Sequence, residues 1–169
     1  MRPNLAVALV ALLSTAAPAN TEQLFVHRLA PLEGQWIGEG SGKPGETKGA
    51  PFEFRFELGK KVLVRKSTAD YPAASGRPAV HHEDLLVSWA DQSGAVKAKY
   101  WDNEGHVIDY AVSVSADATM FSFVSAGAPA FKLTYQLTGN DALKIEFAIS
   151  PQGKADGFKT YLSGTASRK

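Results

Sequence analysis

The pattern that most constrains this chain is an alternation of apolar and polar residues, which is clearest in the segment 52–58. Apolar residues stand there at every second position, with charged residues between them: Phe52, Phe54, Phe56 and Leu58 against Glu53, Arg55 and Glu57. Successive side chains of a strand point to opposite faces, so this spacing predicts a strand with one buried and one solvent-facing side. Segments 131–137 and 143–149 repeat the pattern, and seven further segments bring the predicted total to ten strands.

The connections between these segments favour antiparallel neighbours. Short turns rich in glycine, asparagine and aspartate occur at 58–60, 91–94, 102–105, 139–141 and 151–153. Such residues accept the backbone conformations of tight hairpins, whereas a Greek-key sandwich needs long crossovers. An open meander would leave two bare edges, which closure removes. The sequence therefore predicts an all-β, up-and-down antiparallel β-barrel of about ten strands, with a short N-terminal helix over 21–32 lying across one end.

The first nineteen residues have the layout of a secretory signal peptide. Arg2 supplies the positive charge, residues 5–13 are an uninterrupted apolar run, and Ala17-Pro18-Ala19 offers small residues for cleavage. The run is shorter than the roughly 20 apolar residues of a membrane-spanning helix. We therefore expect a signal peptide at 1–19, one barrel domain at 20–169, no membrane insertion after cleavage, and a periplasmic or secreted protein.

Composition excludes several classes of function. The 18 Lys and Arg residues include Arg2, so cleavage leaves 17 against 17 Asp and Glu. A neutral chain lacks the basic excess that nucleic acid or anionic lipid requires, and we expect neither as a partner. The absence of cysteine excludes disulfides, thiolate metal sites and cysteine nucleophiles, and it suits a bacterial periplasm.

The segment 32–40, Leu-Glu-Gly-Gln-Trp-Ile-Gly-Glu-Gly, resembles the Gly-x-Trp-x-Gly-x-Gly opening strand of nitrobindin-like and other calycin barrels. It is similar also to the start of an uncharacterised bacterial exported family with the same barrel. The resemblance continues, loosely, in Leu-Leu-Val-Ser-Trp at 85–89 and in Tyr-Trp-Asp-Asn-Glu-Gly at 100–105. It implies a calycin-like or lipocalin-like barrel in which Trp36 plugs the end near the helix.

The same resemblance does not extend to a haem site. Nitrobindins hold haem through a histidine on a strand close to the C-terminus, and the segment 158–164 contains no histidine. The likeness therefore implies the fold without the haem ligand. We assign no cofactor and no metal to this chain.

The richest polar cluster is His-His-Glu-Asp at 81–84, which enters a predicted strand. Alternation sends His81 and Glu83 to one face together with Trp89, and sends His82 and Asp84 to the other. The sequence leaves open which of these faces points into the barrel, and it leaves the same choice open between Val64 and Arg65. An inward Arg65 would suit a carboxylate, as in calycins that bind fatty acids.

Three functions fit these observations. The first is an exported, non-catalytic barrel that binds a small, mainly apolar molecule. The ligand-lining residues expected for it are Phe54, Phe56, Arg65, His81, Glu83, Trp89 and Tyr110. The second is an enzyme that uses histidine and carboxylate acid–base chemistry in the cavity, and the third is a filled barrel with a structural or interaction role. The first is the preferred hypothesis, and it assigns no catalytic residue.

Overall fold

A computed structural model describes residues 21–40, 48–71, 73, 76 and 78–169, so the expected signal peptide at 1–19 lies outside the described residues. The helix α1 (Thr21–Leu29) is followed by a 3-10 turn (Ala30–Leu32). The strands are β1 (Gly34–Gly40), β2 (Lys48–Glu57), β3 (Val62–Tyr71), β4 (Val80–Ala90), β5 (Val96–Asp102), β6 (Val107–Val114), β7 (Met120–Ser125), β8 (Ala130–Leu137), β9 (Ala142–Ser150) and β10 (Lys159–Arg168). No helix in this part of the chain is both long and apolar enough to cross a membrane.

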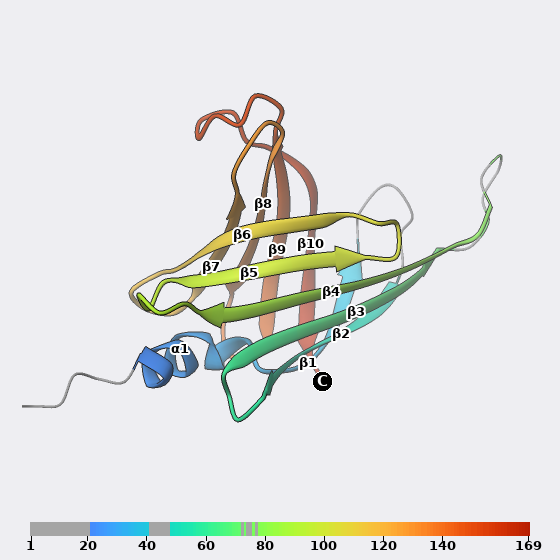
Figure 1. Ribbon diagram of the computed structural model, residues 1–169. Helices are drawn as coiled ribbons and strands as arrows, with labels where there is room; N and C mark the ends of the chain where they lie inside the picture. The colour runs from blue at the N-terminus through green and yellow to red at the C-terminus, as the bar shows by residue number, and fades with distance from the viewer. Residues whose placement is uncertain (1–20, 41–47, 72, 74–75, 77) are drawn as a thin grey trace, which may run out of the picture.

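The ten strands form one closed antiparallel barrel. Each strand pairs with the next along the chain, and β1 pairs with β10 to close the ring. Figure 1 shows β3 to β6 crossing in front of β8 to β10, with α1 below them. The predicted all-β, up-and-down barrel with one short N-terminal helix is confirmed, and no strand is left with an unpaired edge.

The pairing register decides which residues share the inner face. Phe54 lies opposite Arg65, and Arg65 lies opposite Leu86 on the next strand. Residues directly opposite one another in a sheet point to the same side, so all three side chains face the interior. The β2–β3 turn that sets this register contains Gly59 at φ 65°, a conformation that glycine adopts without steric cost.

One end of the barrel, which we call the closed end, is sealed by α1 and Trp36. Phe25 of α1 packs edge-on against Phe56, with ring centroids 6.0 Å apart. The buried Trp36 donates a hydrogen bond from Nε1 to the Leu32 carbonyl over 2.9 Å. The guanidinium of Arg168 lies 4.2 Å from the centre of the Trp36 ring and would meet any Cβ at Gly34. The expected plugging role of Trp36 is therefore confirmed, and the opposite end, the mouth, carries the β3–β4 and β5–β6 connections.

Candidate functional site

The candidate site is centred on Arg65, whose side chain points into the barrel from the middle of β3. The sequence did not decide between Val64 and Arg65, because either residue suits a strand of alternating pattern. The register decides it: the hairpin from β2 places Arg65, and not Val64, opposite the inward Phe54. A positive charge is therefore held inside the barrel.

Two partners from different walls hold the Arg65 guanidinium. Its Nη2 donates to Asp84 on the neighbouring β4 in an ion pair, and its Nη1 donates to the hydroxyl of Tyr135 over 2.6 Å. The strands β3 and β8 lie on opposite sides of the closed ring, so the contact with Tyr135 spans the interior. We call the three residues Arg65, Asp84 and Tyr135 the cross-barrel strut.

The strut is largely withdrawn from water. The Arg65 side chain is 11% exposed and that of Asp84 is 9% exposed. The Nε–H group of Arg65 is the one buried side-chain polar atom among the described residues that has no hydrogen-bond partner. A guanidinium has five N–H donors, so this cation retains donor capacity that the described protein groups do not use.

Burial and charge act against each other in the strut. Burial alone would raise the pKa of Asp84, but the nearby Arg65 and the hydrogen bond from His82 hold that pKa below its usual range. Burial raises the pKa of Tyr135 and also that of Tyr100, which keeps both phenols neutral at physiological pH. The buried centre is therefore one cation, one anion and neutral hydroxyls.

Further polar contacts extend from the strut to the mouth. His82 shares the inner face with Asp84 and lies 3.5 Å from it, and its other ring nitrogen lies 3.4 Å from Glu104. The hydrogen bond to Asp84 raises the pKa of His82. Asp102 accepts a hydrogen bond from Tyr100 over 3.2 Å and contacts His106 at 2.8 Å. Among the described residues, no group of three or more His, Asp or Glu side chains is arranged to hold a metal ion.

Aromatic rings fill the interior around the strut and from there to the closed end; we call this part the packed half. Successive rings meet edge to face at centroid distances of 5.2–6.3 Å, in the order Phe52, Phe54, Tyr135, Phe123 and Tyr110. Such pairs add roughly 0.5–1.5 kcal/mol each beyond area burial. The rings are buried, and the packed half is a core rather than a container.

Between the strut and the mouth, inward side chains are less completely covered; we call this the mouth half. Phe131 and Phe147 stack with ring centroids 6.0 Å apart, yet both are only half-buried. Tyr100 and Ile108 are likewise half-buried although they belong to the inner face. These four side chains pack against the buried core and keep part of their surface exposed to water.

The structure distributes the predicted ligand-lining residues over three places. Arg65 lies in the strut. Phe54, Phe56 and Tyr110 lie in the packed half, where they contact other rings rather than open space. His81, Glu83 and Trp89 lie on the outer face of β4, because the register turns the other face of that strand inward.

The outer-face position of His81 and Glu83 corrects their expected role at the ligand. His81 contacts Asp70 at 2.6 Å and Glu83 at 3.4 Å in a solvent-exposed cluster. Trp89 lies opposite Val62 and Lys97 on the same outer face. These three residues therefore do not line the interior, and the predicted partition of the 81–84 cluster between two faces is confirmed.

Sequence reasoning did not assign a site role to Asp84 or Tyr135. Asp84 was placed on the face opposite Glu83, and Tyr135 was one of several aromatic residues in an alternating strand. The strand registers carry the missing signal, because they place Phe54 opposite Arg65 and Ser67 opposite Asp84. The contact between Arg65 and Tyr135 joins walls 70 residues apart in sequence, and no local pattern reveals it.

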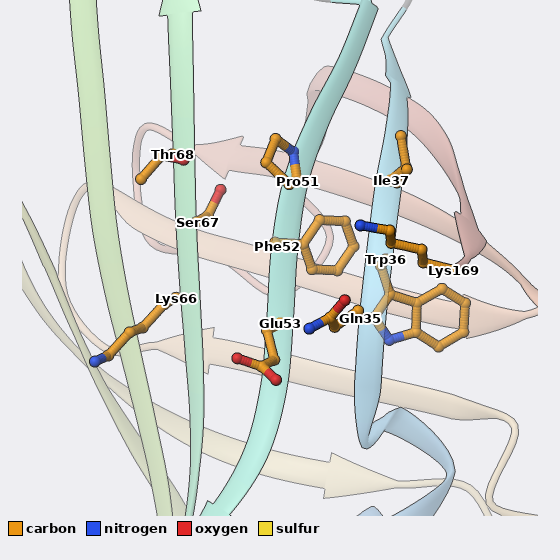
Figure 2. Close-up of a pocket in the computed structure, with 10 residues that line it drawn as sticks. All are labelled: Gln35, Trp36, Ile37, Pro51, Phe52, Glu53, Lys66, Ser67, Thr68 and Lys169. Atoms are coloured by element: carbon orange, nitrogen blue, oxygen red, sulfur yellow. The ribbon is translucent and has the colours of Figure 1, made fainter.

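A second concavity lies outside the barrel. It is an open groove of about 280 Å³ over β1, β2 and β3, shown in Figure 2 with Lys169 lying across β1. Its side chains include the outward Gln35, Ile37, Lys66 and Thr68, while Trp36, Phe52 and Ser67 belong to the inward rows of the same strands. The groove is therefore lined by residues of both rows of these strands.

Comparison with known proteins identifies the fold. The chain is similar to the crystal structure of Rv2717c from M. tuberculosis, with a TM-score of 0.57 over 86% of this chain and 97% of that chain. The two sequences are 16% identical, so the likeness concerns the fold alone, which in this chain is a closed ten-stranded barrel. No family model and no curated protein sequence matches the chain.

Proposed function

We propose that this chain is an exported, non-catalytic barrel that binds one small, mainly apolar molecule in its mouth half. The observation that carries the proposal is the division of a closed barrel by the cross-barrel strut. On one side the interior is packed with rings, and on the other side inward apolar groups remain partly open to solvent. An apolar enclosure with a few polar groups at its base is the usual form of a small-molecule site.

The walls of the mouth half supply the apolar surface. Phe131 and Phe147 present stacked rings from β8 and β9. On β3, the inward positions that follow Arg65 carry the small residues Ser67 and Ala69, which occupy little volume. A ligand lying there covers apolar surface that is now half-exposed, at roughly 25 cal/mol per Å².

The proposal includes export and a periplasmic or secreted location. It rests on the signal-like sequence at 1–19, and N-terminal sequencing of the protein from its native host tests it. We expect the mature chain to begin at Asn20 or within a few residues of it. A protein that still begins at Met1 contradicts export, without affecting the binding proposal.

Titration with the neutral dye N-phenyl-1-naphthylamine tests binding. We expect blue-shifted emission that saturates at one dye per barrel. Ala69→Phe fills the mouth half from β3 and should abolish the binding. Native mass spectrometry of the protein purified from its own host should show one retained small molecule.

The matched control is Thr68→Phe, which adds the same ring to the outer face of the same strand. It blocks the outer groove of Figure 2 and leaves the interior unchanged. Dye binding lost in Thr68→Phe and retained in Ala69→Phe would assign the ligand to the outer groove. A wild-type protein that binds no dye would leave the filled structural barrel as the better description.

A second candidate function rests on His82, which is an inward histidine beside a carboxylate. Its contacts with Asp84 and Glu104 and its raised pKa suit a proton donor or acceptor at the mouth. Turnover of p-nitrophenyl esters by wild type that is lost in His82→Gln, with dye affinity unchanged, would favour the enzyme. Equal background rates in both proteins would favour the binding protein.

A further inference from the structure

The charge balance of the strut limits which polar end the ligand carries. Arg65 is already paired with Asp84, and the pair lies among the neutral hydroxyls of Tyr135 and Tyr100. Burial raises the pKa of both phenols, so neither adds a charge near neutral pH. The strut itself therefore carries no net charge, although it contains a guanidinium.

A carboxylate ligand is poorly suited to this arrangement. To reach Arg65 it must approach the buried Asp84, and two carboxylates on one guanidinium repel each other more strongly where water is scarce. The carboxylate must also lose its own hydration, and the cation that it would meet, Arg65, is already paired with Asp84. The electrostatics therefore oppose a fatty-acid-like ligand, which an inward Arg65 alone would have favoured.

A neutral acceptor is not subject to these costs. Arg65 has five N–H donors. Its Nη1 donates to Tyr135 and its Nη2 donates to Asp84. Its Nε–H has no acceptor in the described part of the chain. A ligand carbonyl oxygen takes up donor capacity of the guanidinium, after a small shift of that side chain, without adding charge. A buried donor without an acceptor is unfavourable, so this hydrogen bond favours binding.

We propose that the mouth half selects apolar molecules whose polar end is a neutral carbonyl, as in a ketone, ester or amide, over carboxylates of the same chain length. This selectivity rests on the proposed function, because it describes the ligand of the same site. Asp84 is then the specificity-determining residue, and Arg65 is the donor.

Undecan-2-one and decanoate test the selectivity, because they share one nine-carbon chain and differ by a methyl group against an oxygen anion. Each is titrated at pH 8 against protein loaded with N-phenyl-1-naphthylamine. We expect wild type to bind the ketone at least tenfold more tightly. Asp84→Asn removes the competing anion, and it should shift the ratio of the two Kd values at least tenfold toward decanoate.

Asp109→Asn is the matched control, because Asp109 pairs with Lys99 on the outer face at 3.1 Å. It should leave the ratio unchanged. A wild type that prefers decanoate, or an unchanged ratio in Asp84→Asn, overturns the selectivity while leaving a binding protein in place. Failure of the proposed function differs, because wild type then binds neither the dye nor either competitor.

A spectroscopic measurement covers the case in which Asp84→Asn does not fold. The carbonyl stretch of 13C-labelled undecan-2-one bound to wild type should lie below its frequency in hexane, since a guanidinium donor weakens the C=O bond. Arg65→Met should remove that shift. A carbonyl stretch of the bound ketone that equals its value in hexane overturns the proposal.

Discussion

The two halves of the barrel interior are built by the same strands and differ in what the alternate residues place inside. In the packed half, Phe54 and Phe123 meet Tyr135 from two sides, and little space remains. In the mouth half, Ser67 and Ala69 occupy equivalent inward positions further along β3 and fill far less volume. Alternation alone therefore builds the barrel, and the size of the inward residues decides where it is solid.

The largest effect on stability is expected when one ring in each half is truncated to alanine. Phe54→Ala should lower the free energy of unfolding by about 4 kcal/mol, because a fully packed ring is replaced by a cavity. Phe147→Ala should cost about half as much, since that ring is already half-exposed. Urea denaturation of the two variants beside wild type measures both values.

The dye affinity of the same two variants gives a second test of the difference between the halves. Phe54→Ala should leave the affinity for N-phenyl-1-naphthylamine within about twofold, while Phe147→Ala should weaken it, because only Phe147 lies in the mouth half. Equal stability costs in the two variants would mean that the interior is packed from end to end. The division into two halves would then fail.

The boundary between the halves is tested by breaking the strut from one side. Asp84→Ala leaves the buried Arg65 charge without its anion and should cost about 3 kcal/mol. Arg65→Met combined with Asp84→Leu removes both charges, and it should bring the stability back to within about 1 kcal/mol of wild type. Thermal and urea unfolding of the single and double variants complete the cycle.

A double variant as unstable as Asp84→Ala would contradict this account. It would mean that the side chains of the strut stabilise the barrel by their shape and packing, rather than by mutual neutralisation of charge. The dye titration remains informative in that case, since Tyr135 and the rings beneath it are unchanged.

Much of the fold was predictable because alternation is a local property. The alternation over 52–56 reports one buried face without reference to any other strand, although Leu58, which continues the pattern, is an exposed turn residue. The short turns fix antiparallel order. The predicted helix over 21–32 is also observed, with its last three residues in a 3-10 turn because Pro31 lacks a backbone N–H. Ten strands with short turns leave few alternatives to closure.

The site was less predictable because it depends on register and on contacts between opposite walls. In the segment 62–65, three of the four residues are apolar. If the β2–β3 turn were one residue longer or shorter, Val64 would point inward in place of Arg65. The 81–84 cluster shows the same limit. Alternation correctly divides its residues between two faces, but only the pairing of β4 with β3 shows which face points inward. Tyr135 became part of the site only through a contact across the closed ring.

The polar contacts at the mouth should make a smaller, pH-dependent contribution to stability. The hydrogen bond to Asp84 raises the pKa of His82 in the folded state above its value of about 6.5 in the unfolded chain. The stability this supplies is fully present below that unfolded value and is lost as the pH rises through the folded pKa. His82→Gln should therefore be less stable than wild type at pH 6 and nearly equal at pH 9.

Guanidinium denaturation at the two pH values, at matched ionic strength, measures this difference. The low folded pKa of Asp84 keeps that carboxylate ionised across the same window, so it adds no pH dependence there. A deficit of the same size at pH 6 and pH 9 would contradict a role for the charge on His82.

The smallest expected effect compares Arg65 with an arginine on the neighbouring strand that faces the other way. Arg55 lies on the outer face of β2, where it pairs with Glu57 at 2.5 Å while its side chain remains 59% exposed. Exposed pairs contribute little because water already solvates both charges, so Arg55→Met should change the free energy of unfolding by no more than about 0.5 kcal/mol. The same substitution at Arg65 should destabilise the barrel and return the carbonyl stretch of bound 13C-labelled undecan-2-one toward its frequency in hexane, whereas Arg55→Met should leave the lowered stretch unchanged. If the two variants behave alike in urea denaturation and in the infrared measurement, the inward charge has no special role, and the mouth half is only an apolar space.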